Sequence, residues 1–69
     1  MNPMEARVNG QRRAVRPGET LLTLVEELGL KPDRLAIELD RRIVKPNQWA
    51  STEIADGAEV EIVHFVGGG

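Results

Sequence analysis

The sequence predicts an α+β fold in which a mixed sheet of four to five strands packs on one helix. Three observations support this fold class. A hairpin pattern opens the chain, one amphipathic stretch at helical spacing follows it, and period-two alternation dominates the second half. The length of 69 residues allows one domain with one modest hydrophobic core. An SH3-like barrel would need more strands and no such helix, so it is the less favoured architecture.

The hairpin is predicted from the first alternating segment. Residues 5–8 alternate between polar and apolar side chains, and the dipeptide Asn9-Gly10 follows them. This dipeptide favours a type I′ turn, because both central positions of that turn need a positive φ. Residues 12–15 then read as the returning strand.

A single helix is predicted over about residues 20–28. Thr20 stands at the N-cap position, and Gly29 stands at the C′ position, where a positive φ suits glycine. Pro32 prevents any continuation of the helix. The apolar stripe at helical spacing consists of Leu21, Leu24, Val25 and Leu28. We expect this stripe to face the core.

The second half of the chain predicts three further strands. Residues 35–39 alternate, a short strand begins at residues 43–44, and residues 59–66 form the longest candidate. The dipeptide Asp56-Gly57 predicts a turn before this last strand. Trp49 lies in a predicted turn, and we expect it to fold back onto the core because a tryptophan side chain buries on the order of 200 Å².

The order of these elements predicts the connectivity of the sheet. The helix separates a hairpin from a strand-rich second half, and a right-handed crossover makes the first and last strands parallel central neighbours. This arrangement is the β-grasp, or ubiquitin-like, architecture. We expect residues 1–66 to form this domain and residues 67–69 to form a flexible Gly-Gly-Gly tail.

Composition argues against several function classes. Nine basic residues are interleaved with eleven acidic ones and the net charge is −2, so the sequence shows no nucleic-acid footprint. No apolar run reaches the roughly 20 residues of a membrane span, and the N-terminal segment lacks the layout of a signal peptide, so we expect no membrane contact and a cytoplasmic location. The absence of cysteine removes disulfides, thiol nucleophiles and cysteine metal sites. The only histidine, His64, makes no metal or catalytic centre by itself.

The most informative feature is the glycine run Gly67-Gly68-Gly69. Glycines can stay extended and pass through a narrow channel, and three of them reach about 10 Å. Such a tail could place the terminal carboxylate of Gly69 in a partner's active site. A carboxylate becomes reactive as an acyl-adenylate, and the chain has no glycine motif for binding ATP, so the partner must supply the catalysis. The alternative is that the glycines are a frayed terminus.

Several segments carry a family resemblance. They are Val8-Asn9-Gly10, Gly18-Glu19-Thr20-Leu21 with Leu24 and Leu28, Ala36-Ile37, residues 43–49 and residues 56–69. In this order they resemble the thiamine-biosynthesis sulfur carriers, the ThiS family, over nearly the whole chain. A terminal Gly-Gly is shared by all ubiquitin-like carriers, so the ordered set is more specific than any one motif.

The resemblance implies a cycle of chemistry on Gly69. An E1-like adenylyltransferase adenylates its carboxylate, and sulfur from a persulfide converts the adenylate into a thiocarboxylate. Thiazole synthase then accepts the sulfur for the thiazole ring of thiamine. By this resemblance the chain is a protein co-substrate without catalytic residues or a cofactor of its own, because ATP and the persulfide are used by the partner. We expect a monomer when the chain is free.

The last strand predicts where these enzymes dock. Alternation puts residues 60 and 62 and His64 on the core face, and it puts Val63 and Phe65 on the opposite face. Exposed apolar side chains beside a functional end often mark a partner site. We therefore hypothesise that both enzymes dock on Val63, Phe65 and Val66. The alternative is that loops cover this face and that Phe65 is a satellite core residue.

Other functions of the same tail stay open on the sequence alone. Within the fold, the chain could be the small subunit of molybdopterin synthase or a carrier for tRNA thiolation. It could also be a protein modifier conjugated through Gly69 to lysines, because the activation chemistry is the same. A pure interaction module with an inert tail is a further class, and for it deletion of Gly68 and Gly69 would leave function intact.

Overall fold

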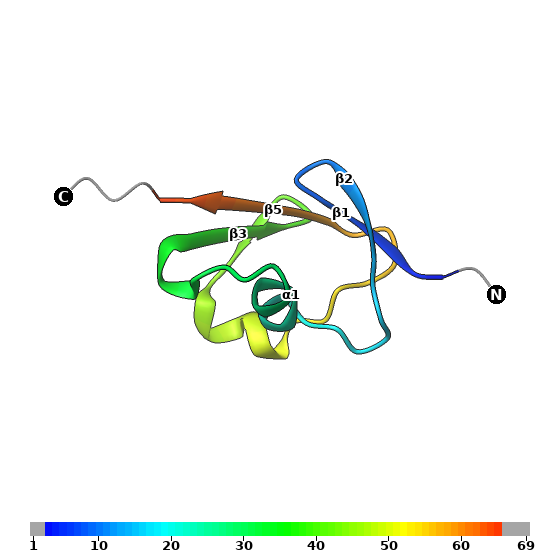
Figure 1. Cartoon of the computed structure of the whole chain (residues 1–69), viewed down its shortest axis with the longest axis horizontal. Helices are drawn as coiled ribbons and strands as arrows, with labels where there is room; N and C mark the ends of the chain where they lie inside the picture. Colours follow the sequence, from blue (N-terminus) through cyan, green and yellow to red (C-terminus); the bar gives the residue numbers. More distant parts are fainter. Residues whose placement is uncertain (1–2, 66–69) are drawn as a thin grey trace.

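The computed structural model describes residues 3–65, so the predictions on Val66, Gly67, Gly68 and Gly69 lie outside the described residues. The elements are β1 Glu5–Val8, β2 Gln11–Ala14, α1 Leu21–Glu27, the 3-10 helix η1 Pro32–Arg34, β3 Leu35–Leu39, β4 Arg42–Val44, the 3-10 helix η2 Pro46–Ser51 and β5 Glu59–His64. The strands form one five-stranded sheet, and α1 lies on one of its faces (Figure 1). The α+β prediction is confirmed.

The sheet has the strand order β2-β1-β5-β3-β4. β1 and β5 run parallel to each other, as predicted, and the other neighbouring pairs are antiparallel. The connection from β1 to β5 therefore crosses over the face that α1 covers. This order places β5, the strand that leads toward the predicted tail, at the centre of the sheet and between two hydrogen-bonded neighbours.

Tight turns join two of the three antiparallel pairs, β1–β2 and β3–β4. Asn9 and Gly10 have φ values of 52° and 82°, which confirms the predicted type of turn between β1 and β2. The turn between β3 and β4 uses Asp40 and Arg41, with φ values of 50° and 71°. The sequence gives a weaker signal for this second turn because neither residue is glycine, although aspartate tolerates a positive φ better than most residues.

The ends of α1 follow the predicted caps. The Thr20 hydroxyl accepts a hydrogen bond from the backbone N–H of Thr23 at 3.2 Å. Gly29 has a φ of 70°, and the N–H groups of Gly29 and Leu30 donate to carbonyl groups in the last turn. Between residues 3 and 65, no helix has both the length and the apolar character needed to cross a membrane.

The hydrophobic core lies between α1 and the covered face of the sheet. The buried apolar residues are Ala6, Val15, Leu21, Leu24, Val25, Leu35, Ile37, Trp49, Ile54, Ala58, Val60 and Ile62. Three members of the predicted helical stripe are therefore in the core. Leu28, the C-cap residue of α1, packs against the core but is only half-buried.

Trp49 anchors the segment after β4 to the core. Its side chain is 1% exposed, and its Nε1–H donates to the carbonyl of Val44 at 2.8 Å. The indole therefore fills the core with its ring and satisfies its only donor at the sheet edge. The predicted anchor is confirmed, although the segment forms η2 rather than an isolated turn.

A small charge cluster joins the end of α1 to the hairpin. Glu27 Oε2 lies 3.5 Å from a guanidinium nitrogen of Arg13 and 3.4 Å from one of Arg16. A hydrogen bond with the Glu19 side chain, and then the positive charges of Arg16 and Arg13, lower the pKa of Glu27. In the part of the chain that the structure describes, the Glu19 Oε2 atom is buried without a hydrogen-bond partner.

The lowered pKa of Glu27 predicts a pH-dependent contribution to stability. A carboxylate whose pKa falls on folding stabilises the fold at pH values above its ordinary pKa of 4.5. This contribution is lost as the pH falls through the lower folded-state pKa. We expect Glu27→Gln to be slightly less stable than the parent chain in urea unfolding at neutral pH, and the two to converge well below pH 4.5. If the free energies of unfolding of the two chains differed by the same amount at both pH values, the lowered pKa of Glu27 would be wrong.

Candidate functional site

Hydrogen bonds to β3 support β5 up to the last described residue. β5 pairs with β3 from Val60 to His64. The Phe65 N–H then donates to the carbonyl of Arg34 at 2.9 Å, which extends the pairing one residue beyond the strand. One edge of β5 is therefore held as far as Phe65, the last of the predicted docking residues that the structure describes.

The other edge of β5 is held differently, because β1 ends first. The register between the two strands stops at Val8 and Val60, where the chain turns at Asn9. The backbone N–H of Asn9 donates to the carbonyl of Val60 at 2.8 Å. Its side chain then holds both backbone groups of Ile62: Oδ1 accepts the Ile62 N–H at 2.7 Å, and Nδ2 donates to the Ile62 carbonyl at 3.3 Å. The local sequence pattern identifies Asn9 only as a turn residue.

The outer face of β5 is open to solvent. Val60 and Ile62 are buried on the inner face, whereas Val63 and Phe65 are 53% and 57% exposed. The predicted alternation is therefore correct for these four residues. The alternative in which loops cover Phe65 does not fit an exposure of this size. No helix or loop within residues 3–65 covers the face of the sheet on which Val63 lies (Figure 1).

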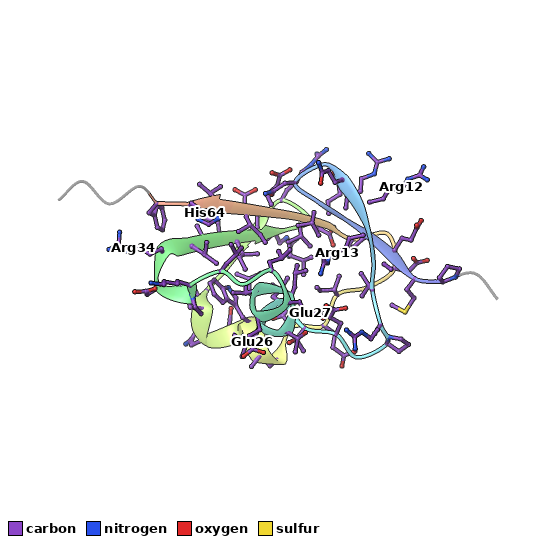
Figure 2. The ribbon with its side chains drawn as sticks, in the orientation of Figure 1. Arg12, Arg13, Glu26, Glu27, Arg34 and His64 are labelled. Atoms are coloured by element: carbon purple, nitrogen blue, oxygen red, sulfur yellow. The ribbon has the colours of Figure 1, made fainter. Side chains whose placement is uncertain are left out.

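His64 departs from the prediction that it lies on the core face, because its side chain is exposed. At this end of the sheet, the loop after α1 and the end of β5 border a hollow of about 410 Å³. His64 borders this hollow together with Lys31, Arg34 and Phe65. Arg34 and His64 lie at the same end of the molecule, where β5 ends (Figure 2). The end of β5 is therefore bordered by basic side chains on its inner side.

An apolar groove adjoins Phe65 on the β4 side. It has a volume of about 590 Å³ and runs between η1, β3 and the end of β4. Ile43 borders this groove and is 72% exposed, which makes it the most exposed large apolar side chain in residues 3–65. The predicted docking surface did not include Ile43. A period-two pattern of only three residues in β4 gives too little signal to assign its faces.

Acidic side chains lie next to the exposed apolar ones. Glu38 of β3 and Glu61 of β5 are directly opposite each other in the register, and both are exposed. Like charges at such positions destabilise a sheet. Neither carboxylate belongs to an ion pair within residues 3–65. Arg41 and Glu59 line the same hollow as this carboxylate pair and Val63, so acidic side chains outnumber basic ones beside Val63.

The described residues show no side chains arranged for metal binding. No group of three or more histidine, cysteine, aspartate or glutamate side chains gathers between residues 3 and 65 in a way that could hold an ion. The features that the fold brings together at the end of β5 are an open apolar surface, a carboxylate pair and a basic hollow. These are features of a surface for binding another molecule.

Comparison with known proteins identifies the family. The model of the ThiS family matches residues 6–69. The chain belongs to the ThiS family. The match includes the glycine run, which lies outside the described residues, and the resemblance noted in the sequence is confirmed.

Solved ThiS structures share the fold. The crystal structure of the thiamine biosynthesis protein ThiS from Geobacter metallireducens is 28% identical, with a TM-score of 0.79 over 96% of this chain and 100% of that chain. The solution structure of a thiamine biosynthesis protein from the same organism is 28% identical, with a TM-score of 0.74 over 96% of this chain and 88% of that one. The β-grasp prediction is confirmed.

Two curated relatives of this ThiS-family chain are larger proteins. A protein from Magnetococcus marinus named thiazole synthase is 30% identical over 66 residues, which are 96% of this chain. A thiazole synthase from Paramagnetospirillum magneticum is 35% identical over 66 residues, also 96% of this chain. The chain spans only about 20% of the length of each of these relatives. They therefore contain a ThiS-like segment as a minor part.

Proposed function

We propose that this chain carries sulfur as a thiocarboxylate at Gly69 and delivers it to thiazole synthase in thiamine biosynthesis. Membership of the ThiS family is the single observation that carries the proposal. The architecture supports it, because β5 lies at the centre of the sheet and leads toward Gly69 from a well-anchored strand. Because the chain has no cysteine, it cannot carry sulfur as a cysteine persulfide, and the carboxyl group of Gly69 is the proposed carrier group.

The proposed chemistry takes place in partner active sites. A carboxylate oxygen of Gly69 attacks the α-phosphorus of ATP, and pyrophosphate leaves. The terminal sulfur of a persulfide then attacks the acyl carbon and expels AMP, which forms an acyl disulfide. A thiol cleaves the S–S bond of this acyl disulfide and leaves the thiocarboxylate on Gly69, while the donor side becomes a disulfide. The chain supplies the acyl group, and the E1-like adenylyltransferase supplies the ATP site and the catalytic groups.

The outer face of β5 is the proposed docking surface for both enzymes. Val63 and Phe65 provide exposed apolar area beside the tail, and Val66 continues this segment. Glu38 and Glu61 would favour a partner surface that brings positive charge, because such a partner offsets their repulsion. The two relatives named thiazole synthase support that enzyme as one partner over molybdopterin or tRNA thiolation enzymes. We further propose that the chain works in the cytoplasm without binding a cofactor itself.

Reconstitution tests the proposed function. The purified chain is incubated with the E1-like adenylyltransferase of its own organism, ATP and a persulfide donor, and then with thiazole synthase and its other substrates. We expect pyrophosphate release that depends on the chain, followed by a thiazole product whose sulfur comes from the chain. Adducts joined to lysines through Gly69, formed without any thiocarboxylate, would instead identify a protein modifier.

A further inference from the structure

We propose that Asn9 is a positioning residue for the adenylation of Gly69, because its side chain fixes the end of β5 from which the docking residues project. The inference rests on the proposed function. It concerns a residue that lies neither in the tail nor on the docking surface. Its side chain acts through the backbone of Ile62, at 2.7 and 3.3 Å.

The Asn9 amide replaces a missing part of the parallel ladder. A peptide group presents one acceptor and one donor to a neighbouring strand, and the side-chain amide of asparagine presents the same pair. β1 has no residue left to pair with Ile62, because the chain turns away at Asn9. The side-chain amide of Asn9 therefore takes the place of the next peptide group of β1, and it forms hydrogen bonds with both the backbone N–H and the carbonyl of Ile62.

This contact determines how far β5 is held from both sides. Without it, the β1 edge of β5 would be supported only as far as Val60, to which the Asn9 backbone donates. The segment bonded to β3 alone, from which Val63 and Phe65 project, would then begin directly after Val60 instead of after Ile62. A strand held on one edge opens locally more often than a strand held on both edges. The two docking side chains would spend less time in the arrangement that a partner recognises, and association would weaken.

Asp40 provides a matched control, because its side chain and backbone bond to the same strand, β5. It also lies in a hairpin turn with a positive φ, 50° against 52° for Asn9. Its backbone N–H donates to the carbonyl of Glu59 at 2.8 Å, and its Oδ1 accepts the Glu59 N–H at 3.0 Å. Asp40 therefore holds the beginning of β5 in the way that Asn9 holds its later part, but at the end away from the tail.

The test compares Asn9→Gly with Asp40→Gly in the full chain. Glycine accepts a positive φ, so both variants keep their turns and lose only the side-chain bonds to β5. We expect Asn9→Gly to accelerate amide hydrogen exchange at Ile62 by about tenfold, as the loss of a net-stabilising hydrogen bond predicts. In adenylation, measured as ATP–pyrophosphate exchange, we expect its KM for the chain to rise about fivefold with kcat unchanged. Asp40→Gly should change neither quantity.

Asn9→Asp separates the two hydrogen bonds of the amide. This variant keeps the oxygen that accepts the Ile62 N–H, but it replaces the Nδ2 donor with a second oxygen that cannot donate to the Ile62 carbonyl. We therefore expect its KM to lie between the KM values of the parent chain and of Asn9→Gly. An Asn9→Gly variant with the KM of Asp40→Gly would overturn the positioning role while the proposed function stands. A parent chain that is not adenylated at all would overturn both. Measurements well below the unfolding temperature keep differences in global stability out of the comparison.

Discussion

Deletion of Gly68 and Gly69 is expected to abolish adenylation of the chain while leaving its free energy of unfolding unchanged. The core, the caps and the sheet that the structure describes are all built from residues 3–65, so the deletion removes none of these contacts. It withdraws the terminal carboxylate by about 7 Å of extended chain. Misplacement of a reacting group by only about 1 Å can cost a hundredfold in rate. We therefore expect chain-dependent pyrophosphate release to fall by at least about a hundredfold.

The control for this deletion is removal of Met1 and Asn2 from the other terminus. Both truncated chains are compared with the parent in the same pyrophosphate assay and in thermal unfolding. The N-terminal truncation should be adenylated like the parent chain. Full adenylation of a chain without Gly68 and Gly69 would show that the tail is not the acceptor, and would favour an interaction module with an inert terminus.

Phe65→Asp is expected to block adenylation by preventing docking. The few residues that dominate a protein interface each cost about 2 kcal/mol or more when they are replaced, and with Phe65 in that role we expect KM for the chain to rise by at least about thirtyfold. Because Phe65 is 57% exposed, the free energy of unfolding should change by no more than about 0.5 kcal/mol. Pyrophosphate release and urea unfolding measure the two effects separately.

Ala50→Asp is the matched control for the introduced charge. Ala50 is also exposed but lies in η2, away from the outer face of β5. This variant should keep the KM of the parent chain. Unfolding of the Phe65→Asp variant under conditions where Ala50→Asp stays folded would mean that Phe65 supports the core, and the docking role would then be wrong.

The parts of the fold that could be predicted depend on local rules. The Asn9-Gly10 turn, the Thr20 cap and the Gly29 helix end each follow from the φ values or hydrogen bonds of a few consecutive residues. The alternation in β5 correctly separates Val63 and Phe65 from the core. Once these elements are set, the handedness of the crossover leaves the parallel pairing of β1 and β5 as the favoured arrangement.

The parts that could not be predicted depend on contacts between distant segments. Asn9 and Ile62 are 53 positions apart, and nothing in a turn dipeptide indicates a bond to another strand. His64 continues the alternation of β5, yet it is exposed because the loop after α1 leaves a hollow beside it. The groove beside Ile43 likewise arises only when η1, β3 and β4 are brought together. For the candidate site, the sequence thus predicts the residues of β5 but not the neighbours that surround them.

We expect Gly69 to carry sulfur as a thiocarboxylate, and the mass of the intact protein from its native cells measures this modification. Part of the population should exceed the mass of the unmodified chain by the exchange of one oxygen for sulfur, and fragments should place this exchange at Gly69. This part should disappear in cells that lack the adenylyltransferase. If Gly69 stayed an unmodified carboxylate in cells actively making thiamine, the proposed sulfur-carrier function would be wrong.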